Sequence, residues 1–267
     1  MALTALFSAA TGMKAQETNQ DVISNNISNM STTAYKRVRA NFQDLLYQQL
    51  SAAGSVDGEG NQVPSETAVG LGVQLVNTQR EFSQGRLEQT SRELDIAIEG
   101  KGFFQVQLPE DVGRGGYGFT RDGNLYIDSD GNLVTGQGYK LQPSMSFPSN
   151  YTDVAISADG TISVGTPDST ARTELGQLEL AYFMNQEGLE AIGGNVYLET
   201  DASGSATPGT PGADGLGTLQ QGYLESSNVE LVDELVQMIR TQRAFEFNSE
   251  SIKTADEMLQ VLAQLRR

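Results

Sequence analysis

The sequence predicts an α+β protein in which N- and C-terminal helices form a coiled-coil-like domain, with a mostly antiparallel β domain inserted between them. Three observations lead to this prediction. Apolar residues recur at helical spacing near the start of the 267-residue chain. Near its end they recur at heptad intervals. Between these regions lie almost all glycines and all prolines, with short alternating apolar runs, which is typical of strands joined by tight turns.

The first predicted helix begins close to the N-terminus, and its apolar residues trace one helical face. These residues are Leu3, Leu6, Ala10, Met13, Val22, Ile23, Ile27 and Met30. Asn25, Asn26 and Asn29 lie in the same segment, and asparagine side chains bond backbone groups where a helix ends. We therefore expect these asparagines to fix the exit from the helix, with Ile27 and Met30 buried beside them.

The last predicted helix follows Asn228, a candidate N-cap, and glycine and proline are absent from 223–267. Every seventh position carries an apolar residue, which defines a heptad seam: Leu231, Met238, Phe245, Ile252 and Leu259. Leu235, Ile239, Ala255 and Leu262 add to the apolar surface of this helix. Two interpretations stay open, namely a terminal hairpin packed on its own domain, or helices that pair with those of other chains.

The middle of the chain reads as β structure. The sequence Asp-Gly-Asn-Leu occurs at 122–125 and again at 130–133, and Asp-Gly supplies the positive backbone angles of tight hairpin turns. A meander of short strands is therefore predicted here. Further strands are expected at 103–108, 154–157, 161–164, 176–183 and 195–198.

These patterns predict a division into three parts. Residues 1–45 and 223–267 form the terminal-helix domain, 46–69 form an extended linker, and 70–222 form the β-rich domain. The segment 201–217 is rich in Gly, Ala, Ser, Thr and Pro, and we expect it to be a flexible loop.

Composition limits the chemistry that the chain can perform. The net charge is -17, which disfavours nucleic acids and anionic membrane surfaces, and no apolar stretch approaches the roughly 20 residues that span a bilayer. The basic cluster Lys36, Arg37 and Arg39 is interpreted as a contact to an acidic neighbouring subunit. We expect no nucleic-acid partner, no direct membrane insertion and no cleaved signal peptide, because no basic residue precedes the short apolar run at the start.

Catalysis is not expected either. The chain contains no histidine and no cysteine, so the usual general base and the thiolate nucleophiles and ligands are missing. Asp128, Asp130 and Asn132 imitate the start of a calcium loop, but position 139 is Tyr where that loop needs Glu, and a hairpin turn explains the same residues. We expect no catalytic residue, no metal site and no cofactor. A carboxylate-based hydrolase stays open as an alternative, because 34 acidic residues are present.

One segment points to a family. Residues 21–36, DVISNNISNMSTTAYK, resemble the N-terminal signature of flagellar rod and hook axial proteins. The resemblance continues through 42–47, 84–85, 99–104, 119–124 and 136–139, so it covers nearly the whole chain. Within the family, the length, the segment 47–64 and the stretch 219–228 are most similar to subunits of the distal rod, whereas hook subunits are longer.

The resemblance implies a structural subunit that self-assembles into a rigid helical tube and transmits motor torque across the periplasm to the hook. It implies export by the flagellar type III apparatus, and contacts with itself, with proximal rod and hook subunits, and with the P-ring and L-ring proteins. The assembly interface would comprise the apolar and Asn positions of both terminal helices given above. Tyr47, Leu50, Val56, Val63 and Pro64 would belong to a rod-specific segment. The alternatives are a proximal rod or short hook-like subunit within the family, and a secreted adhesin-like β protein outside it.

Overall fold

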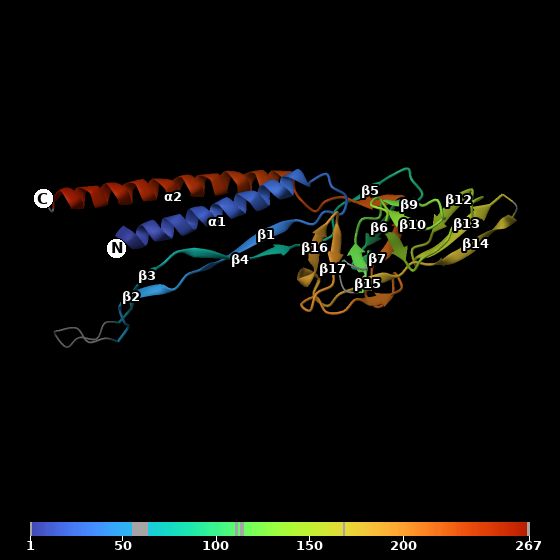
Figure 1. Cartoon of the computed structure of the whole chain (residues 1–267), viewed down its shortest axis with the longest axis horizontal. Helices are drawn as coiled ribbons and strands as arrows, with labels where there is room; N and C mark the ends of the chain where they lie inside the picture. Colours follow the sequence, from blue (N-terminus) through green and yellow to red (C-terminus); the bar gives the residue numbers. More distant parts are fainter. Residues whose placement is uncertain (1, 55–63, 110–111, 113–114, 168, 266–267) are drawn as a thin grey trace. The chain divides into compact units, whose positions relative to one another are not determined.

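The computed structural model describes residues 2–54, 64–109, 112, 115–167 and 169–265. The chain forms two compact units, and each is built from separate stretches of sequence (Figure 1). Unit 1 comprises Met1–Ser28, Val38–Arg80 and Glu230–Arg267, and unit 2 comprises Asn29–Arg37 and Glu81–Val229. Long terminal helices and many antiparallel strands confirm the α+β class.

Unit 1 contains both long helices. Helix α1 spans Ala2–Ser28 and α2 spans Leu231–Leu265, and the absence of glycine and proline allows α2 to continue for 35 residues. The two helices lie side by side (Figure 1). They run antiparallel, because Asn19 contacts Thr241 while Asn26 contacts Glu234.

Two antiparallel strand pairs complete unit 1. Strand β1 (Val38–Asp44) pairs with β4 (Val73–Arg80), and β2 (Tyr47–Ser51) pairs with β3 (Thr67–Gly70). Between β3 and β4 the chain passes close to α1 at Gly72, where φ is +118° and an added Cβ would lie 2.1 Å from Thr11 Oγ1. A glycine is required there by both backbone conformation and space. The segment 46–69, expected to be an extended linker, thus contains a strand pair.

Unit 2 is built from antiparallel sheets. The largest has the order β16-β17-β8-β7-β11-β10-β9, with β15 pairing to β7 and β18. Its strands are β7 (Phe103–Gln107), β8 (Tyr117–Thr120), β9 (Leu125–Ile127), β10 (Leu133–Thr135), β11 (Lys140–Gln142), β15 (Leu180–Tyr182), β16 (Glu190–Gly193), β17 (Val196–Leu198) and β18 (Thr207–Gly209). The smaller sheets are formed by β12 (Asp153–Ile156), β13 (Thr161–Thr166) and β14 (Ser169–Gln177), by β6 (Ile96–Glu99) with β19 (Thr218–Gln221), and by β5 (Leu87–Gln89) with β20 (Tyr223–Glu225). A short 3-10 helix, η1, covers Gln186–Gly188.

Most strand predictions are confirmed. The repeated Asp-Gly-Asn-Leu sequence forms the β9–β10 hairpin, with Gly131 at φ +82° in its turn. The stretch 176–183, expected to be one strand, is split between β14 and β15, because Leu178 turns into the core and its N–H bonds the carbonyl of Gly160. The prediction of a flexible loop at 201–217 is wrong in part, since Thr207–Gly209 forms β18 and pairs with β15. Composition cannot report such long-range pairing.

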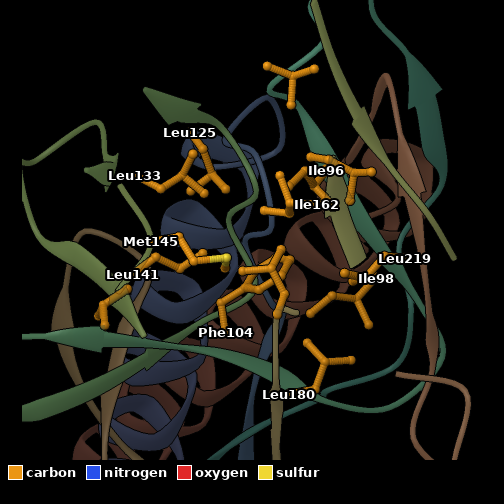
Figure 2. Packing of buried hydrophobic residues seen from close by; sticks show 14 of the residues in the cluster. Ile96, Ile98, Phe104, Leu125, Leu133, Leu141, Met145, Ile162, Leu180 and Leu219 are labelled. Carbon is orange, nitrogen blue, oxygen red and sulfur yellow. The ribbon is translucent and has the colours of Figure 1, made fainter. Parts of the chain in front are cut away.

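The core of unit 2 is made from the inward faces of these sheets. Figure 2 shows Ile96, Ile98 and Leu219 from the β6–β19 pair meeting Phe104, Leu125, Leu133 and Leu141 of the large sheet and Ile162 of β13. A second cluster is aromatic: Phe183 packs edge to face against both Phe103 and Phe119, with ring centroids 5.8 Å and 4.7 Å apart. Unit 2 thus has a dense core of its own.

Candidate assembly surface

The contact between α1 and α2 is made mostly from small and polar residues, with Ile23 as a large apolar one. Ala9, Ala15 and Ile23 of α1 are buried, as are Glu234, Thr241 and Ala255 of α2. At Gly12 the helices approach so closely that an added Cβ would lie 2.8 Å from Asn248 Nδ2. Small side chains permit this approach, and they carry no apolar period that would have revealed the contact from sequence.

The large apolar residues of α2 are mostly left outside this contact. Leu235 is 45% exposed, Ile239 59% and Phe245 42%, while Met238, Ile252 and Leu259 are half-buried. Leu231 and the neighbouring Val232, Val236, Phe247, Met258 and Val261 are exposed as well. Of the remaining predicted positions, Ala255 is buried, and the side chain of Leu262 lies outside the described ones. Of the predicted heptad seam, Leu231 and Phe245 are therefore left exposed, whereas Met238, Ile252 and Leu259 are partly covered.

The predicted positions of α1 divide between both sides of the helix. Ile23 and Asn26 are buried, whereas Leu6, Met13, Val22 and Ile27 are half-buried. Ala10 and Asn25 are exposed, and the side chain of Leu3 lies outside the described ones. Ala10 was expected on the apolar face, but Ala9 is the buried alanine, because the stripe facing α2 is offset by one residue.

The exit from α1 depends on Asn26, as its position suggested. Its Nδ2 donates to the carbonyl of Val38 at 2.8 Å, and its Oδ1 accepts from the N–H of Val38 at 3.0 Å. This pair of bonds holds the start of β1 against the end of the helix. Asn29 is half-buried and its carbonyl accepts from Thr32 N–H in the following turn. The expectation that Met30 is buried is wrong, since this turn projects its side chain outward and leaves it exposed.

Asn228 does not cap α2, which begins three residues later at Leu231. Its Oδ1 accepts from the N–H of Arg37 at 2.7 Å, and its Nδ2 donates to the carbonyl of Glu81 at 2.8 Å. Asn228 therefore fastens the end of the 29–37 segment to the rest of unit 2.

A fully buried ionic cluster holds the same segment. Lys36 Nζ lies 2.6 Å from Glu225 Oε1, and Arg121 Nε lies 2.9 Å from Glu225 Oε2. Ser83 O and Gly85 N–H complete the hydrogen bonding of Lys36 and Glu225, at 2.8 Å each. Burial, with the nearby Arg121 charge, lowers the pKa of Lys36 to about 8, against the opposing effect of Glu225. The interpretation of Lys36 as a contact to another subunit is thus wrong, because its partner is in its own chain.

The segment 47–64 is described at its two ends. Tyr47 and Leu50 lie in β2 and are exposed, and Pro64 is exposed beyond the gap. Val56 and Val63 lie outside the described residues. Next to β2, the side chains of Thr4, Phe7, Leu45, Leu46 and Leu71 line an apolar pocket of about 450 Å³. Leu46 and Phe7 are strongly exposed at its edge, so this end of unit 1 carries a second unoccupied apolar surface.

The described part of the chain shows no cluster of acidic side chains arranged to hold a metal ion. Its helices also lack the combination of length and apolar character needed to cross a membrane. The surface that distinguishes unit 1 is the apolar one given by the exposed side chains of α2 and by the pocket beside β2.

Comparisons with known proteins indicate the same family in the N-terminal, middle and C-terminal parts of the chain. Three family profiles match it: "Flagella basal body rod protein" at 6–36, "Flagellar hook protein FlgE/F/G D1 domain" at 97–164, and "Flagellar basal body rod FlgEFG protein C-terminal" at 220–265. The flagellar basal-body rod protein FlgG of Buchnera aphidicola subsp. Acyrthosiphon pisum is 48% identical over 98% of this chain and 100% of its own length. The FlgG proteins of Caulobacter vibrioides and Borreliella burgdorferi are 47% and 45% identical, each over 99% of this chain and at least 99% of their own. The chain therefore belongs to the flagellar basal-body rod protein family, as a structural subunit of the rod and not an enzyme.

Proposed function

We propose that this rod subunit builds the distal part of the rod, where copies assemble through their terminal helices into a rigid helical tube. The tube transmits motor torque across the periplasm to the hook. The proposal is supported by the full-length similarity to FlgG proteins and by the apolar surface that α2 leaves uncovered. A proximal rod or hook-like role is less well supported, because the FlgG relatives match over their whole length.

The observation that carries the proposal is the outer face of α2. Soluble monomers rarely expose long contiguous apolar patches. Here large apolar side chains remain exposed from Leu231 to Val261, although α1 packs along the same helix. Identical subunits stacked head to tail would cover this face with the helices of neighbouring copies.

The partners follow from that position in the rod. We propose proximal rod subunits on one side, hook subunits on the other, and the P-ring and L-ring proteins around the tube, with delivery by the flagellar type III export apparatus and without a cleaved signal peptide. Nucleic acid, membrane insertion and a cofactor have no place in this mechanism. Residues 1–45 and 223–267 would form the inner tube and 70–222 the outer domain. The acidic excess of the chain, -17, would then keep the outer surface well solvated.

The test places a charge among the apolar residues of α2, at the exposed Phe245 or the half-buried Ile252. Phe245→Asp or Ile252→Asp would bury an unpaired carboxylate at each subunit contact, which costs several kcal/mol. We expect subunits that are exported and fold in unit 2, but build no rod when basal bodies are imaged. Gln264→Asp is the matched control, since it adds the same charge at an exposed position of α2 that is already polar. Normal motility of Ile252→Asp cells would contradict the assembly mechanism.

A further inference from the structure

Polar and small residues meet along the contact of α1 and α2 at regular steps. Asn19 Nδ2 donates to Thr241 Oγ1 at 2.8 Å, and Asn26 Nδ2 lies 3.4 Å from Glu234 Oε2. Gly12 meets Asn248 one step further along. Each step of seven residues on α1 is matched by a step of seven in the reverse direction on α2. We call these three contacts the polar ladder.

The ladder occupies the position where a helix pair usually places its large apolar residues. Thr241 and Glu234 are 3% and 1% exposed and Asn26 is buried, whereas Gly12, Asn19 and Asn248 are half-buried, so the ladder is most deeply buried at Asn26–Glu234. Polar residues at core positions of paired helices lower stability but specify register and partner, because a wrong alignment leaves a buried polar group without its match. Polar residues in the contact with α1 therefore give α2 a means of selecting its register and its partner.

Sliding one helix past the other by one heptad shows which contact of the ladder distinguishes the observed register from a shifted one. In one direction Asn19 would meet Asn248, but Glu234 would lose the amide of Asn26. In the other direction Asn19 would meet Glu234, while Asn26 would lose Glu234 and Asn248 would face Ala5. Asn26 cannot follow α2 in either case, because both of its amide atoms are bonded to the backbone of Val38. The Asn26–Glu234 pair is thus the fixed point of the register.

We propose that the polar ladder determines helix partner and register in the assembled rod: each α2 pairs with α1 of its own chain, aligned by Asn26–Glu234, Asn19–Thr241 and Gly12–Asn248. The need for such selection rests on the proposed function, since identical helices of many copies would lie close together in the tube. The large apolar residues of α2 offer little discrimination among identical neighbours. The ladder keeps the pair within one chain, and the apolar face stays available for contacts between chains.

Engineered cysteines test the register directly, because the natural chain contains none. One variant carries Gly12→Cys with Asn248→Cys, a second carries Asn19→Cys with Thr241→Cys, and the control carries Gly12→Cys with Thr241→Cys. The control pair is out of step by one heptad, which is about 10.5 Å of helix rise and beyond the roughly 7 Å Cα separation that a disulfide spans. Basal bodies purified from each strain are oxidised and analysed by non-reducing electrophoresis.

We expect both in-register variants to form a disulfide within one chain, seen as a faster-migrating monomer. The control should form at least about tenfold less of this disulfide, because a register preference above about 1.4 kcal/mol corresponds to a tenfold difference in population. Disulfide-linked dimers in place of the fast monomer would overturn the inference, because the helices would then pair between copies. Equal crosslinking of the control would overturn it as well. The absence of the cysteine-free parent from basal bodies would instead contradict the proposed function.

A second set of variants assigns the effect to the ladder. In the Asn19→Cys and Thr241→Cys background, Glu234→Leu removes the acceptor for the Asn26 amide, and Glu234→Gln retains one of similar size. We expect Glu234→Leu to reduce the in-register disulfide at least about threefold, and Glu234→Gln to preserve it. The oxidation is also performed on whole cells, so that chains that fail to enter rods are still measured. An unchanged pattern in Glu234→Leu, or the same loss in both variants, would overturn the assignment.

Discussion

Glu225 is the centre of the buried ionic cluster of unit 2. It accepts hydrogen bonds from Lys36 and Arg121, and all three side chains are buried. Its backbone carbonyl also accepts from Ala34 N–H at 2.7 Å, at a position where Ala34 adopts the left-handed φ of +57°. The sequence presented Lys36 as part of a basic cluster, and a charge pattern cannot reveal a partner 189 residues away. The motif was informative about family, but the chemistry of its lysine required the structure.

Removing the Glu225 carboxylate should therefore strongly destabilise unit 2. Glu225→Ala leaves two cations buried without a counter-charge, and breaking one side of a buried ionic network costs about 3–5 kcal/mol. We expect a loss of this size in the free energy of unfolding of unit 2, measured by urea titration of the purified chain. Arg172→Ala is the matched control, because it breaks the solvent-exposed pair with Asp153 in the same unit, a kind of pair worth about 0–1 kcal/mol. Equal effects of the two substitutions would show that the cluster adds nothing beyond a surface pair.

The lowered pKa of Lys36 also makes the free energy of unfolding depend on pH. Its pKa is about 8 in the folded chain against 10.5 for the ordinary side chain, so between these values the unfolded chain binds more protons. The free energy of unfolding then increases with pH across this window, since burial of the charged amine ceases to be a cost. Relative to Lys36→Met, the parent should gain up to about 3 kcal/mol between pH 8 and 10.5. Urea titrations of both proteins at intervals of pH measure this, and a flat difference would contradict it.

Among the elements, α2 shows what a sequence pattern predicts correctly and what it does not. Its length follows from the absence of helix-breaking residues, and the apolar residues at heptad spacing do all lie in one helix. The heptad does not identify the surface that α1 covers, because that surface is made from Glu234, Thr241 and Ala255. Alternation and turn residues located β7, β12, β13, β15, β17 and the β9–β10 hairpin of unit 2. Other strands, among them β6, β18 and β19, and the β2–β3 pair of unit 1 were not predicted, because their pairing partners are distant in the sequence or their composition is that of a loop.

The β2–β3 pair gives the segment 47–64 a structural context. Tyr47 and Leu50 are exposed on β2, beside the apolar pocket lined by Leu45, Leu46 and Leu71. In a rod, such side chains would bury against a neighbouring copy and resist sliding between subunits. The described contacts between α1 and α2 at Gly12, Asn19 and Asn26 involve no residue of this segment.

Deletion of 47–64 should therefore separate assembly from stiffness. We expect the shortened subunit to be exported and to polymerise, but to form a curved and compliant tube, because β2 and its apolar contacts are lost. Electron microscopy of rods from the deletion strain measures the curvature, with the full-length strain as the control. Straight rods would identify the segment as a passive linker, and complete loss of polymer would place it in the assembly contact itself.

At the scale of the whole molecule, the two units differ in how they are stabilised. Unit 2 encloses a large apolar core, with Phe103, Phe104 and Ile98 fully buried. Unit 1 buries mostly small and polar residues between its helices, Ile23 apart, and leaves many large apolar ones exposed. An isolated helix pair of this kind has little to stabilise it in water, since helical stability in proteins comes mainly from packing of an apolar face.

This difference predicts the behaviour of the free subunit. In limited proteolysis of dilute, unassembled chain, residues 1–30 and 235–267 should be cleaved well before 100–200, because local opening is easiest where few large apolar groups are buried. Mass spectrometry of the fragments over time gives the order of cleavage. Protection of the ends equal to that of the β core would mean that the helix pair is stable by itself.

The interleaved order of the units along the sequence also has a consequence in time. Unit 2 is complete once the chain has reached Val229, whereas unit 1 lacks α2 until the remaining residues follow. The hydrogen bond between Asn26 and Glu234 joins residues 208 apart, so the helix pair closes one of the longest loops that the chain can form. Contacts of such sequence separation form late, after shorter loops have closed. A chain that emerges N-terminus first thus carries its first helix unpaired throughout the folding of unit 2, and the proposed assembly surface is finished last.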